Sequence, residues 1–197
     1  GADGPTHAGA YDISFMRCIP NMVVAAPSDE NECRLLLNTA YAFNGPAAVR
    51  YPRGSANGTE VSCVSETVEI GKGRILQQGT SIAILCFGPL IHEAQKAIDE
   101  LNKNITLVDM RFIKPIDDAL IKQLAKDHQQ FVTLEDNAIL GGAGSAVLEF
   151  VSFNQLDVKV TLLGIPDAYI EHASQEQQWA EMGIDAAGIK QTLQGLL

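Results

Sequence analysis

The sequence predicts an α/β protein whose larger part is a mostly parallel, mixed five-stranded sheet. From about residue 68 onward, short apolar runs alternate with longer segments whose apolar residues recur at helical spacing. This alternation is typical of a parallel sheet covered by helices on both faces. Before residue 55 there is one further strand–helix–strand unit. Two strands and a helix bury too little surface to fold alone, so we expect this unit to complete a second sheet whose other strands lie in a missing part of the protein or in a separate chain.

The first unit begins at Met22–Ala26, a short apolar run that predicts a buried strand. Ser28–Glu30 then offers an N-cap followed by an acid, which favours a helix start because the N-terminal end of a helix is positive. Asn44–Pro46 ends the helix, and Ala47–Tyr51 reads as the next strand. The apolar face of the helix comprises Cys33, Leu36, Leu37, Ala40 and Tyr41.

A polar stretch separates this unit from the rest of the chain. Residues 56–67 lack periodicity and predict a linker between a first part, 1–55, and a second part, 68–197. The second part opens with two strands, Val68–Leu76 and Ser81–Phe87, on either side of Gln77–Thr80. We expect these strands to form a hairpin that supplies the antiparallel strand of the mixed sheet.

The rest of the second part alternates between helix and strand. Two helices close the chain, with Ile189, Leu193 and Leu196 spaced to pack on the sheet. The predicted elements are helix Ile91–Leu101, strand Ile105–Met110, helix Asp117–Lys126, strand Phe131–Leu134, helix Ala143–Phe153, strand Val158–Leu163, and helices Ser174–Met182 and Asp185–Leu196.

Composition excludes several classes of partner. The formal net charge is -10, so we expect neither nucleic acid nor an anionic membrane surface as a partner, because both require clustered Lys and Arg. The best apolar run, Ile82–Ile91, is too short to span a bilayer. The four cysteines form no C-x-x-C pair and have no His at ligand spacing, so no metal site is expected. An anionic metabolite can still bind through one well-placed arginine.

The first twelve residues combine two aspartates, an imidazole and three glycines in a stretch too polar for a core element. Asp3 accepts hydrogen bonds, and His7 can donate, accept or carry charge near neutral pH. The segment therefore reads as a loop able to bind a substrate rich in hydroxyls or carbonyls. The alternative is a turn whose Asp and Gly serve only backbone geometry.

A second candidate is Arg53, which lies just past the carboxyl end of a predicted strand, the edge where open α/β sheets bind ligands. Its planar fork suits a phosphate monoester. The alternative is a surface arginine paired with an acid.

Other charged and glycine-rich positions have structural explanations. We expect Arg17 and Arg50 to form ion pairs, and the run Leu140–Ser145 to allow either close packing of a helix on the sheet or a contact between domains. Glu135 and Asp136 are expected to cap that helix or to contact a partner subunit. The remaining histidines are expected to be solvated or to cap helices; they are His92, His128 and His172.

Several motifs together resemble one enzyme family. The run His7–Ser14, followed by Arg17–Asn21, is similar to the signature of the transketolase superfamily, and within it most resembles the 1-deoxy-D-xylulose-5-phosphate synthase family. The likeness spans nearly the whole chain. Further motifs similar in order and spacing are Pro27–Glu32, Val49–Gly54, Val108–Pro115 and Glu135–Gly144.

The resemblance implies a domain assignment. Residues 1–55 would be the end of a thiamine pyrimidine-binding domain, and residues 68–197 a transketolase C-terminal-like domain. The family's metal and diphosphate motif and its activating glutamate lie upstream in relatives. We therefore expect no cofactor-binding or metal-binding residue in this chain, with thiamine diphosphate and Mg²⁺ bound mainly by a missing N-terminal part. By resemblance, the enzyme is a cytoplasmic homodimer, with a plastid as the alternative location, and this chain alone is inactive.

The resemblance also implies an activity. The intact enzyme would condense pyruvate with D-glyceraldehyde 3-phosphate and release carbon dioxide, in the methylerythritol-phosphate route that feeds isoprenoid, thiamine and pyridoxal synthesis. Arg53 would bind the aldehyde's phosphate, while Asp3 and His7 would line the substrate pocket, with His7 as the catalytic proton donor or hydrogen-bond donor. The alternatives are a transketolase, a 2-oxo acid dehydrogenase β subunit, or a non-catalytic dimerisation or docking module.

Overall fold

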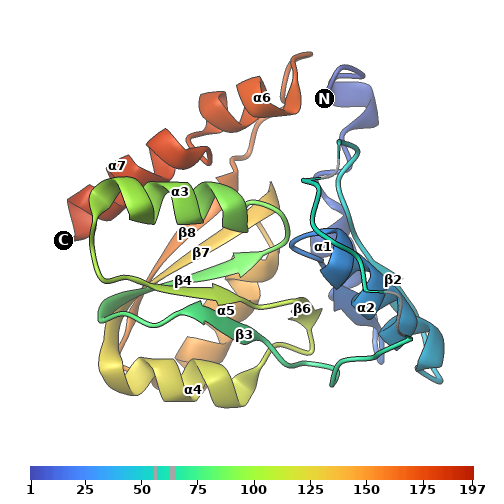
Figure 1. Cartoon of the computed structure of the whole chain (residues 1–197), viewed down its shortest axis with the longest axis horizontal. Helices are drawn as coiled ribbons and strands as arrows, with labels where there is room; N and C mark the ends of the chain where they lie inside the picture. Colours follow the sequence, from blue (N-terminus) through green and yellow to red (C-terminus); the bar gives the residue numbers. More distant parts are fainter. Residues whose placement is uncertain (56, 63–64) are drawn as a thin grey trace.

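A computed structural model describes residues 1–55, 57–62 and 65–197, arranged as two sheets with surrounding helices (Figure 1). The larger sheet has five strands in the order β3-β5-β4-β7-β8, and the smaller has three in the order β2-β1-β6. Residues 56, 63 and 64 of the expected linker lie outside the described residues. The division of the chain at 56–67 stays a prediction.

The five-stranded sheet confirms the predicted fold class. Strand β4 pairs in parallel with both β5 and β7, and β7 pairs in parallel with β8. Strand β3 runs antiparallel to β5, which makes the sheet mixed. The strands are β3 (Arg74–Gln77), β4 (Ser81–Phe87), β5 (Thr106–Asp109), β7 (His128–Ala138) and β8 (Lys159–Ile165).

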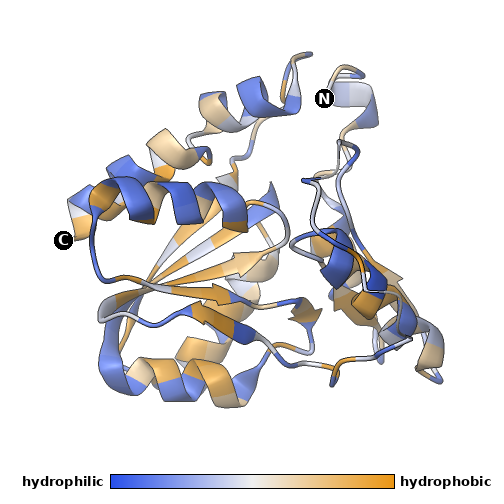
Figure 2. Cartoon of the chain, viewed as in Figure 1, coloured by the Kyte–Doolittle hydropathy of each residue, from blue (hydrophilic) through white to orange (hydrophobic). Residues whose placement is uncertain are grey.

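Helices cover both faces of this sheet, as the alternating pattern predicts. Along β4, Ile82, Ile84 and Cys86 face one cluster, built with α3 and α7, while the residues between them face the other, built with α4 and α5. Figure 2 shows the apolar strands enclosed between helices whose outer sides are polar. Residues Ile189 and Leu193 pack down as expected. The helices are α3 (Ile91–Leu101), α4 (Asp118–Asp127), α5 (Ala143–Phe153), α6 (Gln175–Met182) and α7 (Ala186–Leu196).

The predicted hairpin is wrong. Strands β3 and β4 are neighbours in sequence, but β5 lies between them in the sheet. The backbone of the connection binds the start of β5 instead, since Gly79 N donates to Thr106 Oγ1 at 2.8 Å and Thr80 N to Asn104 O at 2.9 Å. All four residues of β5 are buried, so burial of this strand between β3 and β4 outweighs local pairing across a short turn.

The smaller sheet contains the predicted strand–helix–strand unit plus one strand that the sequence did not reveal. Strands β1 (Val23–Ala25) and β2 (Ala47–Val49) are parallel and joined by α2 (Glu30–Ala42), whose N-cap Asp29 accepts from Glu32 N at 2.8 Å. Strand β6 (Phe112–Lys114) is antiparallel to β1. Three residues are too few to show a period, which explains why β6 was missed.

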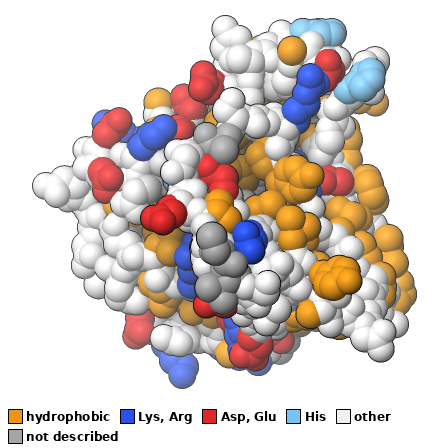
Figure 3. Space-filling model, turned by 45° about the vertical axis from the view of Figure 1, so that its right-hand side comes forward, with side chains coloured by type: hydrophobic (Ala, Val, Ile, Leu, Met, Phe, Trp, Pro, Cys, Tyr) orange, Lys and Arg blue, Asp and Glu red, His pale blue; other side chains and the backbone are white. Residues whose placement is uncertain are grey.

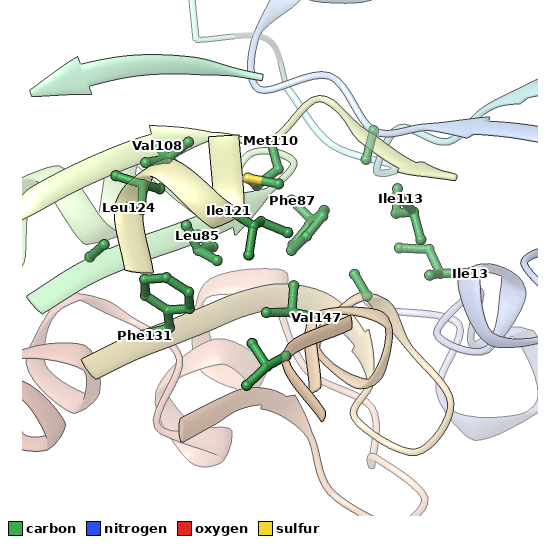
Figure 4. Packing of buried hydrophobic residues seen from close by; sticks show 14 of the residues in the cluster. Ile13, Leu85, Phe87, Val108, Met110, Ile113, Ile121, Leu124, Phe131 and Val147 are labelled. Carbon is green, nitrogen blue, oxygen red and sulfur yellow. The ribbon is translucent and has the colours of Figure 1, made fainter. Parts of the chain in front are cut away.

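Two short helical segments near the start were also not predicted: η1 (Pro5–His7) and α1 (Asp12–Met16). Helix α1 reaches the core through Ile13, which is fully buried. Figure 4 shows Ile13 close to Ile113 of β6, at the edge of the cluster formed by Phe87 and Val147. The opening segment is therefore packed against both sheets at one end only, while residues 1–9 are mostly exposed or half-exposed.

A buried ion cluster joins α2 to the larger sheet. Glu32 is 1% exposed, and its carboxylate accepts from Arg111 Nε at 2.7 Å and Arg111 Nη2 at 2.8 Å. Arg74 Nη1 of β3 lies 3.0 Å from the same carboxylate. Arg74 also binds Asp109 Oδ2 at 3.1 Å, which accepts from Ser28 Oγ at 2.8 Å. Burial raises the pKa of Asp109, and these two partners partly offset the effect.

Candidate functional site

The structure brings together Asp3 and Arg53, two of the three predicted site residues. The guanidinium Nη1 of Arg53 contacts Asp3 Oδ2 in an ion pair. Both side chains remain open to solvent, at 82% exposure for Arg53 and 47% for Asp3. Figure 3 shows histidine side chains near an acidic and a basic side chain at the upper end of one face. The pair is thus a polar, accessible site in which Arg53 has further N–H donors available to a ligand.

The third predicted residue, His7, ends the short η1 segment and is exposed. Its Nδ1 lies 2.9 Å from Thr6 Oγ1. Within the described part of the chain, no hydrogen bond joins His7 to Asp3 or to Arg53. His7 therefore lies on the same loop as Asp3 but is not linked to the Asp3–Arg53 ion pair. A hydrogen bond to Nδ1 leaves Nε2 as the nitrogen that can face a bound molecule.

The base of the opening loop is held by Arg50, whose side chain is 10% exposed. Its Nε lies 3.2 Å from Asp12 Oδ2, and its Nη2 donates to the carbonyls of Gly9 and Asp136. The backbone adds a bond from Ala138 N to Ala10 O at 2.7 Å. The expectation that Arg50 forms a structural ion pair is confirmed, as it is for Arg17, which pairs with Glu149.

Asn137, at the carboxyl end of β7, is a second anchor that sequence reasoning missed. Its Oδ1 accepts from Ile13 N at 3.3 Å, and its Nδ2 donates to Ser14 Oγ at 3.0 Å. The side chain is fully buried. No local signal marks such a residue, because its partners lie more than 120 positions away.

Glu135 caps α5, as one of the two sequence interpretations expected. Its carboxylate accepts from Ala143 N at 2.7 Å and from Gly144 N at 2.8 Å. A Cβ at Gly142 would lie 2.3 Å from Glu135 Oε2, so glycine permits this close approach. Because Glu135 already occupies these amides, the glycine run is a packing element. Burial raises the pKa of Glu135 from 4.5 to about 7, despite the two amide hydrogen bonds that favour its charged form.

A segment from the other end of the chain also reaches the opening loop, which sequence reasoning did not anticipate. Gly4 is buried and has a φ of 68°, and a Cβ there would lie 2.3 Å from the His172 ring. Gln175, at the start of α6, has its Oε1 3.0 Å from a Cβ built on Gly54, and its Nε2 donates to Asp136 Oδ2 at 3.4 Å. These contacts depend on side chains far apart in sequence.

The same residues do not form a metal centre. Among the residues that the structure describes, no group of three or more His, Cys, Asp or Glu is placed to hold a metal ion. The exposed pair of Asp3 and Arg53 offers a single carboxylate, and the positive charge of the adjacent arginine opposes cation binding. These residues therefore do not fit a diphosphate–Mg²⁺ site, and suit an anionic organic ligand instead. Also within the described residues, no helix is long and apolar enough to cross a membrane.

Comparison with known families decides the assignment. Residues 71–189 match the family model of the transketolase C-terminal domain, and residues 1–59 match that of the transketolase pyrimidine-binding domain. The chain belongs to the transketolase family. The predicted fold, with parts of these two domains, is confirmed.

Curated relatives refine the family assignment. The chain is 54% identical to the 1-deoxy-D-xylulose-5-phosphate synthases of Aeromonas hydrophila and Pectobacterium atrosepticum over 98% of its length, and 56% identical to that of Pseudoalteromonas translucida over 96%. The chain spans about a third of the length of these relatives, 30% to 31%. The predicted resemblance to the C-terminal portion of this synthase family is confirmed.

A solved transketolase-family structure has the same fold. A chain described as "Split gene transketolase, inactive beta4 tetramer" superimposes with a TM-score of 0.88 at 28% identity. The match covers 98% of this chain and 64% of that one. The arrangement of the two sheets is therefore a transketolase arrangement.

The raised pKa of Glu135 predicts a specific pH dependence of stability. Between pH 4.5 and about 7 the folded state holds a proton that the unfolded state releases, so the free energy of unfolding falls as pH rises through this window. The slope should be on the order of 1 kcal/mol per pH unit. Glu135→Gln should remove this component, as measured by urea unfolding between pH 4 and pH 8.

The matched control is Glu149→Gln, which changes an exposed carboxylate on α5, the helix that Glu135 caps. This variant should keep the wild-type dependence on pH. Parallel unfolding profiles for the wild type and Glu135→Gln would show that Glu135 does not change its proton binding on folding.

Proposed function

We propose that the protein containing this chain is a 1-deoxy-D-xylulose-5-phosphate synthase, which condenses pyruvate with D-glyceraldehyde 3-phosphate and releases carbon dioxide. The observation that carries the proposal is the contact between Asp3 and Arg53, which joins the opening loop to the Val49–Gly54 motif at an accessible position. Relatives at 54% to 56% identity are named 1-deoxy-D-xylulose-5-phosphate synthase, which supports the same reaction. Because Asp3 and Arg53 are 50 positions apart in the sequence, their contact is made only in the folded protein.

Arg53 is proposed to bind the phosphate of the aldehyde. A guanidinium can form two parallel charge-assisted hydrogen bonds to a phosphate, which a single carboxylate partner does not exhaust. At 82% exposure, the side chain has room to accept the ligand. The ion pair with Asp3 also orients the guanidinium before binding, which lowers the entropy lost when the phosphate is bound.

His7 is proposed to act on the oxygen of the same aldehyde. When the aldehyde carbon is attacked, negative charge develops on its oxygen, and an imidazole can stabilise that charge or supply a proton. The ring is exposed and its Nδ1 is engaged by Thr6 Oγ1, which leaves Nε2 for this task. Asp3, four residues earlier, is proposed to orient a hydroxyl of the acceptor or the imidazole.

The cofactors and partners follow from the family. Thiamine diphosphate, when bound, supplies the carbon chemistry that removes carbon dioxide from pyruvate, and Mg²⁺ would hold its diphosphate. Both are proposed to bind mainly through a further part of the enzyme that resembles the remaining length of the relatives. That part is a proposed partner, together with a second copy in a homodimer. A cytoplasmic location and a role in isoprenoid, thiamine and pyridoxal synthesis are proposed with it.

The rival activities have weaker support. A transketolase would share the fold, but the solved transketolase chain is 28% identical, against 54% for the curated synthases. No observation favours a 2-oxo acid dehydrogenase β subunit or a non-catalytic docking module.

The proposed reaction is tested by incubating the full-length natural polypeptide with pyruvate and D-glyceraldehyde 3-phosphate. Carbon dioxide and 1-deoxy-D-xylulose 5-phosphate should form only when thiamine diphosphate and Mg²⁺ are added. Residues 1–197 assayed alone should give no product, because thiamine diphosphate and Mg²⁺ are proposed to bind mainly through the further part of the enzyme. Absence of product from the full-length protein, or product from a ketose donor without pyruvate, would contradict the assignment.

The role of Arg53 predicts a selective effect on one substrate. Arg53→Ala should raise the KM for D-glyceraldehyde 3-phosphate by roughly 10-fold to 100-fold, the loss expected for hydrogen bonds between charged groups. The KM for pyruvate should change little. Arg53→Lys keeps the charge without the planar fork and should fall between the two. Equal increases for both substrates would count against phosphate binding.

The role of His7 predicts a loss of turnover. His7→Ala should lower kcat by roughly 100-fold or more, the range for removal of a general acid or base. Steady-state kinetics over a range of pH would measure it. His7→Gln retains a hydrogen-bond donor, so recovery of turnover in this variant would identify hydrogen bonding as sufficient. Unchanged kcat in His7→Ala would show that the imidazole only lines the pocket.

A further inference from the structure

A segment that leads into α6 contacts the loop that carries Asp3 and His7. Figure 1 shows this segment and the start of α6 next to the N-terminal residues, at the end of the molecule away from β2. The segment, residues 171–175, follows the five-stranded sheet, whereas Asp3 and His7 precede the three-stranded one. Two parts of the chain separated by about 170 residues therefore meet at the candidate site.

The first contact is between His172 and Gly4. The His172 ring occupies the space where a Cβ at residue 4 would be, at 2.3 Å from two of its atoms. Gly4 also has a φ of 68°, a conformation that favours glycine. Because Gly4 directly follows Asp3, this contact places the imidazole beside the acid that holds Arg53.

The second contact is between Gln175 and Gly54. The amide Oε1 of Gln175 would be 3.0 Å from a Cβ at residue 54, and its Nε2 donates to Asp136 Oδ2. Gly54 directly follows Arg53. One short segment thus lies against the residue after Asp3 and against the residue after Arg53, so each of its two contacts is one position away from a member of the ion pair.

The exposed His172 ring has the chemistry of an anion ligand. Its side chain is 64% exposed despite the contact with Gly4, and its Nδ1 lies 4.0 Å from Glu171 Oε2. An imidazole supplies an N–H donor to a phosphate oxygen and can carry positive charge near neutral pH. Together with Arg53 it would provide donors from two directions.

We propose that His172 is a specificity-determining residue of the acceptor site, where its imidazole donates to the phosphate bound by Arg53. The proposal rests on the proposed function, because that function defines the phosphorylated acceptor. It assigns part of the substrate site to the region that matches the transketolase C-terminal domain. Gln175 acts as a positioning residue that keeps the segment against Gly54 and Asp136.

The test compares two acceptors in the full-length enzyme, D-glyceraldehyde 3-phosphate and unphosphorylated D-glyceraldehyde, each with saturating pyruvate. His172→Ala should lower the ratio of their kcat/KM values by about 10-fold, the effect of losing one hydrogen bond to a charged group. His172→Gln should restore much of the ratio, since its amide also donates. Tyr169→Ala, an exposed change three residues earlier, is the control and should leave the ratio unchanged.

A purely structural role for His172 predicts another outcome. If the ring serves only to pack on Gly4, His172→Ala should lower kcat/KM for both aldehydes equally and leave their ratio at the wild-type value. That result would overturn the proposal. The double variant Gly4→Ala/His172→Ala gives a further check. Gly4→Ala should change the ratio less in the His172→Ala protein than in the wild type, because the ring no longer occupies the space beside residue 4.

Binding provides a measurement that does not depend on turnover. Titration of the full-length protein with inorganic phosphate should shift the His172 ring-proton resonance in NMR spectra, and Arg53→Ala should weaken the response about 10-fold. If the enzyme forms no product from either aldehyde but phosphate still shifts His172, the proposed function fails and the anion site stands. If the enzyme is active and the resonance does not move, the role of His172 is wrong.

Discussion

The relative placement of the two sheets depends on the ion pairs that the buried carboxylate of Glu32 forms with two arginines. Arg111, just before β6, and Arg74, on β3, both bind it, and Asp109 balances the second arginine. Removing one member of such a buried group leaves an uncompensated charge and costs about 3–5 kcal/mol. Arg111 lies between β5 and β6, so the same cluster also holds the start of β6 close to α2. Strand β6 then pairs with β1.

That pairing positions the candidate site. With β6 added to β1, strand β2 ends near β7, where Arg50 reaches Asp136 and Asp12. The loop is thus anchored at its base by buried polar contacts, while Asp3 and Arg53 stay exposed at its tip. A fixed base with an open tip suits substrate binding, because the geometry is largely set before the ligand arrives. Residues 171–175, in the region that matches the transketolase C-terminal domain, contact Gly4 and Gly54 and so form a further side of the site.

Agreement between prediction and structure follows the range of the interactions. Helices α3, α4, α5 and α7 were predicted because their apolar residues repeat within one element. The N-cap at Asp29 and the cap at Glu135 were also recognised, since each uses residues near a helix start. The predicted hairpin between β3 and β4 was wrong because strand order depends on which strands are most buried, and β6 was missed because its three residues are too few to show a period.

The sequence by itself determined the fold class, the family and the choice of Asp3, His7 and Arg53 as candidate residues, because local periodicity and residue chemistry are written in consecutive positions. Only the tertiary structure decided that Asp3 meets Arg53, that Arg50 and Asn137 hold the loop, and that His172 lies on Gly4. Each of these contacts joins residues at least 38 positions apart. Side-chain contacts at that separation arise from packing of whole elements, which no local pattern records.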